Sequence, residues 1–192
     1  MPTPIAVLTD EARGCTRCKL SDLGRTQVVV GMGDPSSDLM FVGEGPGAEE
    51  DRQGLPFVGR SGRLLDQLML EELGVTRDRV YITNVVKCRP PDNRDPEPDE
   101  IASCNPWLEQ QLELVDPAVI VTLGKFASQL LLDTKETITR IRGRSYPFGD
   151  RVLVPTVHPA YVLRGGGGPM AQMRADLIRA KQALAERGVA LA

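Results

Sequence analysis

Four cysteines are the residues of this sequence whose spacing most directly suggests chemistry. Cys15 and Cys18 form a CxxC pair, and Cys88 and Cys104 follow far along the chain, with 15 residues between them. Intracellular proteins seldom use thiols for disulfides. Two further thiolates would complete the ligand set that the CxxC pair begins, for either a tetrahedral zinc ion or a four-iron cluster. The spacing alone leaves both open, together with a simpler interpretation as unrelated buried thiols.

Three other segments place polar residues or glycines directly after short apolar runs. The string GEGPG begins at Gly43, Asn84 ends a second apolar run, and the chain's only histidine, His158, follows a third. Glycine lets a backbone approach a ligand closely, an amide both donates and accepts hydrogen bonds, and an imidazole can donate one to a developing negative charge. Taken singly, each residue also fits an ordinary turn or packing role. A shared site therefore depends on the fold.

The elements that must position these residues follow from hydrophobic periodicity. Five short apolar runs predict buried strands at residues 26–31, 39–43, 80–86, 118–124 and 152–157. Helical patterns lie at residues 61–73, 99–115, 125–132 and 170–187. Ser61 is the predicted N-cap of the first helix and Gly74 its C-terminal stop. Residues 88–100 are so rich in Pro and Asp that they predict a loop.

This alternation of buried strands with helices predicts an α/β fold. We expect a three-layer αβα sandwich around a central, mostly parallel sheet of four to five strands. In such a sheet, ligands bind at the loops that leave the carboxyl ends of strands. The loops after Gly43, Asn84 and His158 are therefore predicted to converge on one crevice. We find no internal repeat, and we expect residues 1–192 to form a single domain.

Composition and charge are those of a globular protein with an uneven charge distribution. The formal net charge is −3. Residues 1–124 hold 12 Lys and Arg against 21 Asp and Glu, whereas residues 125–192 hold 11 against 5. The basic C-terminal third could face phosphates or could be a solvated helix surface. With no apolar run of membrane-spanning length and no secretion signal, we expect a cytoplasmic protein.

Four strings together resemble one known family. They are GEGPGAEED from Gly43, GLPFVGRSGRLLD from Gly54, YITNVVKCRPPDNRDPEPDE from Tyr81 and VHPAYVLR from Val157. They are similar to the family 4 uracil-DNA glycosylases, the iron-sulfur, thermostable-type branch. The resemblance implies a monomeric hydrolase that flips uracil out of single- or double-stranded DNA and cleaves its N-glycosidic bond. Free uracil and an abasic site would result, which initiates base excision repair.

The resemblance also implies a cofactor. The four thiols of Cys15, Cys18, Cys88 and Cys104 would ligate a [4Fe-4S] cluster. Its role would be structural, because glycosidic hydrolysis needs no electron transfer. Such a cluster would order an N-terminal segment that has little core of its own.

The same resemblance assigns roles in recognising the base. Asn84 would offer its carbonyl to the N3–H of uracil and its NH2 to O4, a pattern that cytosine reverses. Phe57 would stack on the flipped ring. Glu50 would fill the space that the C5 methyl of thymine requires. His158 would donate a hydrogen bond to O2 and so stabilise the leaving uracil anion.

The loop after residue 42 and the segment after residue 158 complete the predicted site. Gly43, Gly45 and Gly47 would let backbone approach the base and the attacking water. Related families have an aspartate where this chain has Gly45, so we expect backbone groups to hold the water, with Glu44 as a possible base.

The segment after His158 is predicted to contact DNA. Tyr161, Val162 or Leu163 would wedge into the gap left by uracil, and Arg164 would bind a phosphate. The glycines at 165–168 are predicted to be a flexible spacer. Trp107 and Tyr146 receive no role beyond packing.

Other functions remain possible on the sequence. A sister branch traps the sugar covalently through a histidine in an added loop, which makes it a uracil-DNA binder with little turnover. The corresponding region, TRIRGRSYPFG from Thr139, contains no histidine, which argues against that route. A non-enzymatic iron-sulfur electron carrier would leave Asn84 and Phe57 unexplained. A zinc-binding nucleic-acid module is the third alternative.

Overall fold

The computed structural model describes residues 2–190, in which six strands form one sheet in the order β1-β3-β2-β4-β6-β5. The strands are β1 (Met32–Gly33), β2 (Leu39–Gly43), β3 (Tyr81–Asn84), β4 (Val119–Leu123), β5 (Tyr146–Phe148) and β6 (Arg151–Thr156). The four central strands are parallel, and β1 and β5 pair antiparallel at the edges. The predicted, mostly parallel α/β sheet is confirmed. The two short edge strands explain why six strands replace the expected four to five.

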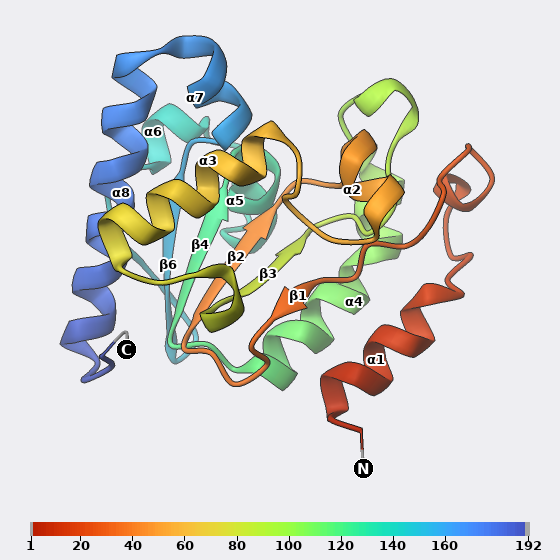
Figure 1. Ribbon diagram of the computed structural model, residues 1–192, viewed down its shortest axis with the longest axis horizontal. Coiled ribbons are helices and arrows are strands. Elements are labelled where there is room, and N and C mark those ends of the chain that lie inside the picture. Colours follow the sequence, from red (N-terminus) through yellow and green to blue (C-terminus); the bar gives the residue numbers. More distant parts are fainter. Residues whose placement is uncertain (1, 191–192) are drawn as a thin grey trace.

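Helices cover both faces of this sheet (Figure 1). The α-helices are α1 (Pro4–Arg13), α2 (Ala48–Gln53), α3 (Arg60–Leu68), α4 (Pro98–Val115), α5 (Lys125–Leu131), α6 (Ile138–Ile141), α7 (Pro159–Gly165) and α8 (Gly167–Glu186). Shorter helical turns are η1 (Lys19–Ser21), η2 (Met69–Leu73), η3 (Arg77–Arg79) and η4 (Pro91–Asn93). Helices α3, α7 and α8 pack on one face, and α1, α4 and α5 on the other. No described helix combines the length and hydrophobicity that a bilayer span requires.

The alternating side chains of β2 show how the sheet separates two cores. Leu39 and Phe41 belong to the cluster beneath α3 and α8, whereas Met40 and Val42 belong to the cluster beneath α1 and α4. Successive side chains of a strand point to opposite faces, and both faces are covered here. Every residue of β2, β3 and β4 is consequently buried. This rigid centre fixes where each strand ends.

One predicted strand is wrong. Residues 26–31 form no strand, because their backbone groups bond mainly to side chains instead of a ladder. The Asp51 carboxylate accepts from the N–H of Thr26 at 2.9 Å, and the Thr83 hydroxyl donates to the carbonyl of Val30 at 2.7 Å. The edge strand β1 begins only afterwards.

Two helix starts also differ from the prediction. Gly59, not Ser61, is the N-cap of α3, because the Glu50 carboxylate accepts from the backbone N–H groups of Val58 and Gly59 and replaces a side-chain cap. Helix α8 begins at Gly167, three residues before the predicted start. The stop at Gly74 is confirmed, with a left-handed φ of 76°.

The glycine run and the acidic loop are more ordered than predicted. Gly165 ends α7, Gly166 forms the turn with φ of 67°, and the next glycines lie in the first turn of α8. The predicted loop 88–100 contains the helical turn η4, and its end from Pro98 belongs to α4. The predicted glycine spacer and part of the predicted loop therefore belong to helices and turns.

Basic residues of the C-terminal third form ion pairs between elements of the fold. Arg142 pairs with the fully buried Asp176 at 2.9 Å, Arg151 pairs with Asp116 at 2.6 Å, and Arg174 pairs with Glu71 at 2.5 Å. Part of the positive charge of the C-terminal third is thus neutralised by carboxylates within the fold, which reduces the cationic face available to phosphates.

Candidate functional site

A pocket of about 430 Å³ opens where the carboxyl ends of β2, β3 and β6 meet. A volume of this size is typical of small-molecule sites. Its lining includes these predicted site residues: Glu44, Gly45, Gly47, Glu50, Phe57, Asn84, His158 and Arg164. The three loops therefore converge as the sequence predicts. Gly43, Tyr161 and Leu163 lie outside the lining.

Asn84 lies almost fully buried at the end of β3, directly opposite Gly43 of β2. Its side-chain oxygen Oδ1 is buried and accepts no hydrogen bond from any described residue. A Cβ at residue 43 would lie 2.4 Å from this oxygen and 2.5 Å from the ring of Phe57. Only glycine at 43 leaves both side chains in place. An orphaned buried acceptor is costly unless a ligand satisfies it.

Phe57 is held in an unusual backbone conformation, with φ of 54°. Its carbonyl accepts a hydrogen bond of 2.6 Å from Arg77, whose guanidinium also pairs with Asp66 at 2.8 Å. A Cβ at Gly62 would lie 1.7 Å from the Phe57 carbonyl oxygen. The ring of Phe57 is centred 5.9 Å from that of His158 at an interplanar angle of 34°. The two rings therefore share one end of the pocket.

Glu50 is fixed by the backbone that follows Phe57. Its Oε1 accepts hydrogen bonds from the N–H groups of Val58 and Gly59 at 2.9 and 2.8 Å. A Cβ at Gly47 would lie 2.8 Å from its other carboxylate oxygen. The carboxylate thus joins α2 to the start of α3, and its side chain presents fixed bulk to the pocket.

His158 is the N-cap of α7. Its Nδ1 accepts a hydrogen bond of 3.1 Å from the N–H of Ala160, so the ring proton of the neutral form lies on Nε2. Burial lowers the pKa of His158 to about 4, and the positive charge of Arg164 adds to this shift. A Cβ at Gly124 would lie 3.0 Å from the Cβ of His158. The imidazole is therefore neutral near pH 7 and keeps Nε2–H as its donor.

Glu44 and Gly45 have contrasting environments on the same loop. Burial raises the pKa of Glu44 to about 7, the negative charge of Asp95 adds to this shift, and Lys125 opposes it. A Cβ at Gly45 would lie 2.6 Å from Cγ2 of Val86. An aspartate at residue 45 would consequently require the Val86 side chain to move. Glu44 is the carboxyl group of this loop whose pKa suits proton transfer near neutrality.

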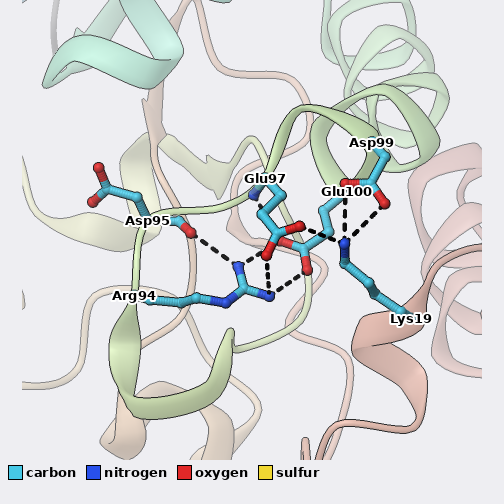
Figure 2. Close-up of polar contacts among 6 residues, drawn as sticks. All are labelled: Lys19, Arg94, Asp95, Glu97, Asp99 and Glu100. Carbon is cyan, nitrogen blue, oxygen red and sulfur yellow. Dashed lines mark hydrogen bonds and ion pairs between the residues drawn. The ribbon is translucent and has the colours of Figure 1, made fainter.

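The opposite wall of the pocket was not predicted from sequence. It is formed by residues of the acidic loop: Pro90, Asn93, Arg94, Asp95 and Pro96. Arg94 makes a two-pronged contact with the fully buried Glu100 at the start of α4, and Figure 2 shows how Glu97 and Asp99 extend this contact to Lys19. Consecutive positive φ values at Asp92 and Asn93 are the structural sign of a specified turn, which composition alone does not reveal.

The segment after His158 is the helix α7, not a loop. Tyr161 is 47% exposed and Leu163 is 49% exposed, whereas Val162 is 2% exposed within the core. The prediction that Val162 could wedge into DNA is therefore wrong, because its side chain packs beneath α7. Arg164 is exposed at the pocket mouth.

The four cysteines line a second, smaller pocket between the segment after α1 (residues 15–28), α4 and the segment after β3. Three N–H groups donate to their sulfurs: Arg25 to Cys88 at 2.8 Å, Trp107 to Cys15 at 3.3 Å and the Lys87 backbone to Cys104 at 3.3 Å. Trp107, predicted only to pack, thus contacts the site. Tyr146 lies in the edge strand β5 and donates to the carbonyl of Ile141.

The cysteine pocket is not arranged around a single point. Among residues 2–190, no three Cys, His, Asp or Glu side chains converge closely enough to hold one metal ion. Burial raises the pKa of the Cys88 thiol to about 11, although the Arg25 guanidinium opposes this shift. The four cysteines therefore line a common space, and burial favours the protonated form of the Cys88 thiol.

Comparison with known proteins agrees with this geometry. The Uracil DNA glycosylase superfamily matches residues 30–182. The chain is 44% identical to a Type-4 uracil-DNA glycosylase of Thermotoga maritima over 95% of each chain, and 46% identical to one of Sulfurisphaera tokodaii over 81% of this chain and 74% of that protein. It is 32% identical to a Type-5 uracil-DNA glycosylase of Thermus thermophilus over 68% of each chain. The chain belongs to the uracil DNA glycosylase superfamily.

Proposed function

We propose that this chain is a uracil-DNA glycosylase that releases free uracil from single- or double-stranded DNA and leaves an abasic site, the first step of base excision repair. One observation carries the proposal. The buried acceptor of Asn84, which no described residue satisfies, lies in the same pocket as Phe57 and the neutral His158. A base must leave the helix to reach such a pocket.

Recognition would rest on a matched pair of hydrogen bonds. Oδ1 of Asn84 accepts from N3–H of uracil, and its NH2 donates to O4. Cytosine reverses both partners, at a cost of about 1–3 kcal/mol for each buried group left unpaired. Stacking on Phe57 contributes about 1–3 kcal/mol and helps to offset unstacking from the helix. The anchored Glu50 occupies the side of the pocket where a thymine methyl group would lie.

Cleavage would depend on stabilising the departing uracil. The bond from C1′ to N1 breaks with its electron pair moving to the ring, and the sugar gains oxocarbenium character. Nε2–H of His158 donates to O2 and holds this charge, which is typically a contribution of about 3 kcal/mol. Water then bonds to C1′, and its proton passes to Glu44 or to solvent. Gly45 has no side chain to hold that water, so backbone groups would hold it.

DNA contacts would come from α7. Arg164, at the pocket mouth, is suited to a phosphate of the uracil nucleotide. Tyr161 and Leu163 are exposed apolar side chains on the same helix, and either can fill the space that the extruded base leaves.

The cysteine pocket fits a [4Fe-4S] cluster held by Cys15, Cys18, Cys88 and Cys104. A zinc ion requires all four sulfurs within about 2.3 Å of one point, whereas a four-iron cluster places each thiolate on a different iron atom. The resemblance of the sequence to the iron-sulfur branch favours the cluster over a zinc ion. Three N–H donors to the sulfurs agree with thiolate ligands. When bound, the cluster supplies a cross-link between distant segments.

We also propose that residues 1–192 act as one monomeric domain inside the cell. Helices from both ends of the chain, α1 and α8, pack on the same sheet, so neither end forms a separate core.

The decisive experiment uses a labelled oligonucleotide with one uracil. After incubation with the purified protein and alkali, we expect strand breaks only at uracil. Asn84→Asp and His158→Ala should each lower the rate on the order of 10²–10³-fold. Asn105→Asp, on the outer part of α4, is the matched control and should retain the parental rate. If His158→Ala cleaves the uracil oligonucleotide at the parental rate, the proposed role of His158 is refuted.

A further inference from the structure

Lys87 is a buried lysine that contacts both pockets. Its exposed fraction is 1%, and it lies three residues after Asn84 and directly before Cys88. Its backbone N–H donates to the sulfur of Cys104 at 3.3 Å, and its ammonium donates to the main-chain carbonyl of Asn84 at 2.5 Å. One residue therefore connects the cysteine pocket to the amide that is proposed to read uracil.

The surroundings of the ammonium leave its charge without a carboxylate partner. Besides Asn84, it donates to the Thr83 hydroxyl at 2.8 Å and to Oε1 of Gln111 at 2.6 Å. All three acceptors are neutral, and no ion pair within 4.0 Å joins Lys87 to an acid in residues 2–190. A buried charge normally needs a counter-charge. Lys87 lines the cysteine pocket, where four thiolates would supply one.

The ammonium also fixes the peptide that follows Asn84. On one side, the N–H of Val85 donates to the carbonyl of Gly43 at 2.9 Å. On the other side, Lys87 holds the Asn84 carbonyl. Together these bonds set the orientation of the strand end from which the Asn84 side chain enters the pocket. Without Lys87, the Asn84 carbonyl loses a charged hydrogen-bond donor, and the orientation of the Asn84 side chain is less well fixed.

We propose that Lys87 is a positioning residue that holds Asn84 in its uracil-reading geometry and draws its charge balance from the four-cysteine site. The proposal rests on the proposed glycosylase function. The cysteine site would then contribute to catalysis through charge and position, in addition to cross-linking the chain.

A double-mutant cycle tests the link to Asn84. Lys87→Met has a similar volume and removes the ammonium. We expect it to lower kcat/KM on a uracil oligonucleotide about tenfold per iron-loaded protein, but by less than about twofold when Asn84→Ala is already present. A purely structural role predicts the same factor in both backgrounds, and that result would overturn the proposal. Thr83→Val, which removes another acceptor and leaves the Asn84 contact, is the matched control and should stay within about threefold of the parent.

Iron release tests the link to the cysteines without using activity. We expect an iron chelator to remove iron from Lys87→Met about tenfold faster than from the parent or Thr83→Val. Equal release rates would refute the charge balance. If Lys87→Met does not fold, Lys87→Gln replaces it, since a neutral amide retains a donor for Asn84 and removes the charge. If the parent protein does not cleave uracil DNA, the proposed function is refuted. If the parent is active but the effects of Lys87→Met and Asn84→Ala are additive, only the role of Lys87 is refuted.

Discussion

The base pocket and the cysteine pocket are built in different ways. The base pocket is formed at the ends of β2, β3 and β6, whose positions the buried sheet fixes. The cysteine pocket joins the segment after α1, the loop after β3 and the middle of α4, which share few backbone hydrogen bonds. The first is a cavity that the fold leaves open, and the second is a junction that the proposed cluster would hold together.

This contrast predicts that the base pocket determines activity and that the cysteine pocket determines local stability. A substitution in the base pocket should change activity and leave the fold intact, because the sheet does not depend on the pocket. Loss of the cysteine ligand should loosen the N-terminal segment while the central strands remain protected. Each prediction below tests one side of this contrast, beginning with the largest effect.

Among the substitutions that test this contrast, Gly43→Ala should produce the largest loss of activity. Its Cβ would lie 2.4 Å from Oδ1 of Asn84 and 2.5 Å from the ring of Phe57, so one of them must move into the pocket. Displacement of a reading group by about 1 Å can reduce rate about 10²-fold, and we expect a fall in kcat/KM of that order. Gly168→Ala, where a Cβ meets no atom within 4 Å, is the control. A Gly43→Ala enzyme with parental kcat/KM would show that the pocket floor is adaptable.

Cys88→Ser tests the other side of the contrast. We expect amide hydrogen exchange in α1 and residues 15–31 to accelerate on the order of 10²-fold, because these segments lose their cross-link to α4. Exchange in β2 and β4 should change by less than about tenfold. Uniform acceleration across the sheet would mean that the cluster supports the whole fold, and the two pockets would then not be separable.

The sequence predicted the parts of both sites that depend on local chemistry. The apolar runs located β2, β3, β4 and β6, and strand ends then placed Asn84 and His158. It did not predict the wall formed by Arg94 and Asp95, since that wall depends on an ion pair with Glu100 and on a turn of positive φ. The strand predicted at residues 26–31 was wrong because side chains distant in sequence form hydrogen bonds with the backbone of this segment. Long-range pairing of this kind leaves no periodic pattern.

Arg77→Met should produce an intermediate effect, although Arg77 lies outside the base pocket. Its guanidinium holds the carbonyl of Phe57 in a left-handed conformation that a non-glycine residue rarely adopts. We expect KM for uracil DNA to rise about tenfold and the free energy of unfolding to fall by about 1–2 kcal/mol. Arg79→Met, an exposed change in the same helical turn, is the control. If Arg77→Met lowered stability but left KM unchanged, Phe57 would keep its position without the arginine.

The smallest effect concerns pH and separates two groups of the same pocket. Burial raises the pKa of Glu44 to about 7 and lowers that of His158 to about 4. If Glu44 accepts the proton of water, kcat should rise with pH through about 7, whereas neutral His158 contributes no limb above about pH 5. We expect Glu44→Gln to flatten this limb with a loss of less than about tenfold at high pH, below the usual range for a general base, because departure of uracil dominates the barrier.

The same carboxyl group should affect stability with the opposite sign. Its folded-state pKa of about 7 lies above the ordinary value of 4.5, so the folded protein binds this proton more tightly than the unfolded chain. Its contribution to stability is complete below about pH 4.5 and is lost as pH rises to about 7, a loss that Glu44→Gln should remove. Asp95→Asn should move the kinetic limb to lower pH, because Asp95 raises the pKa of Glu44. A limb that stays near pH 7 in both variants would assign it to another group, and the loop after β2 would then act through its backbone alone.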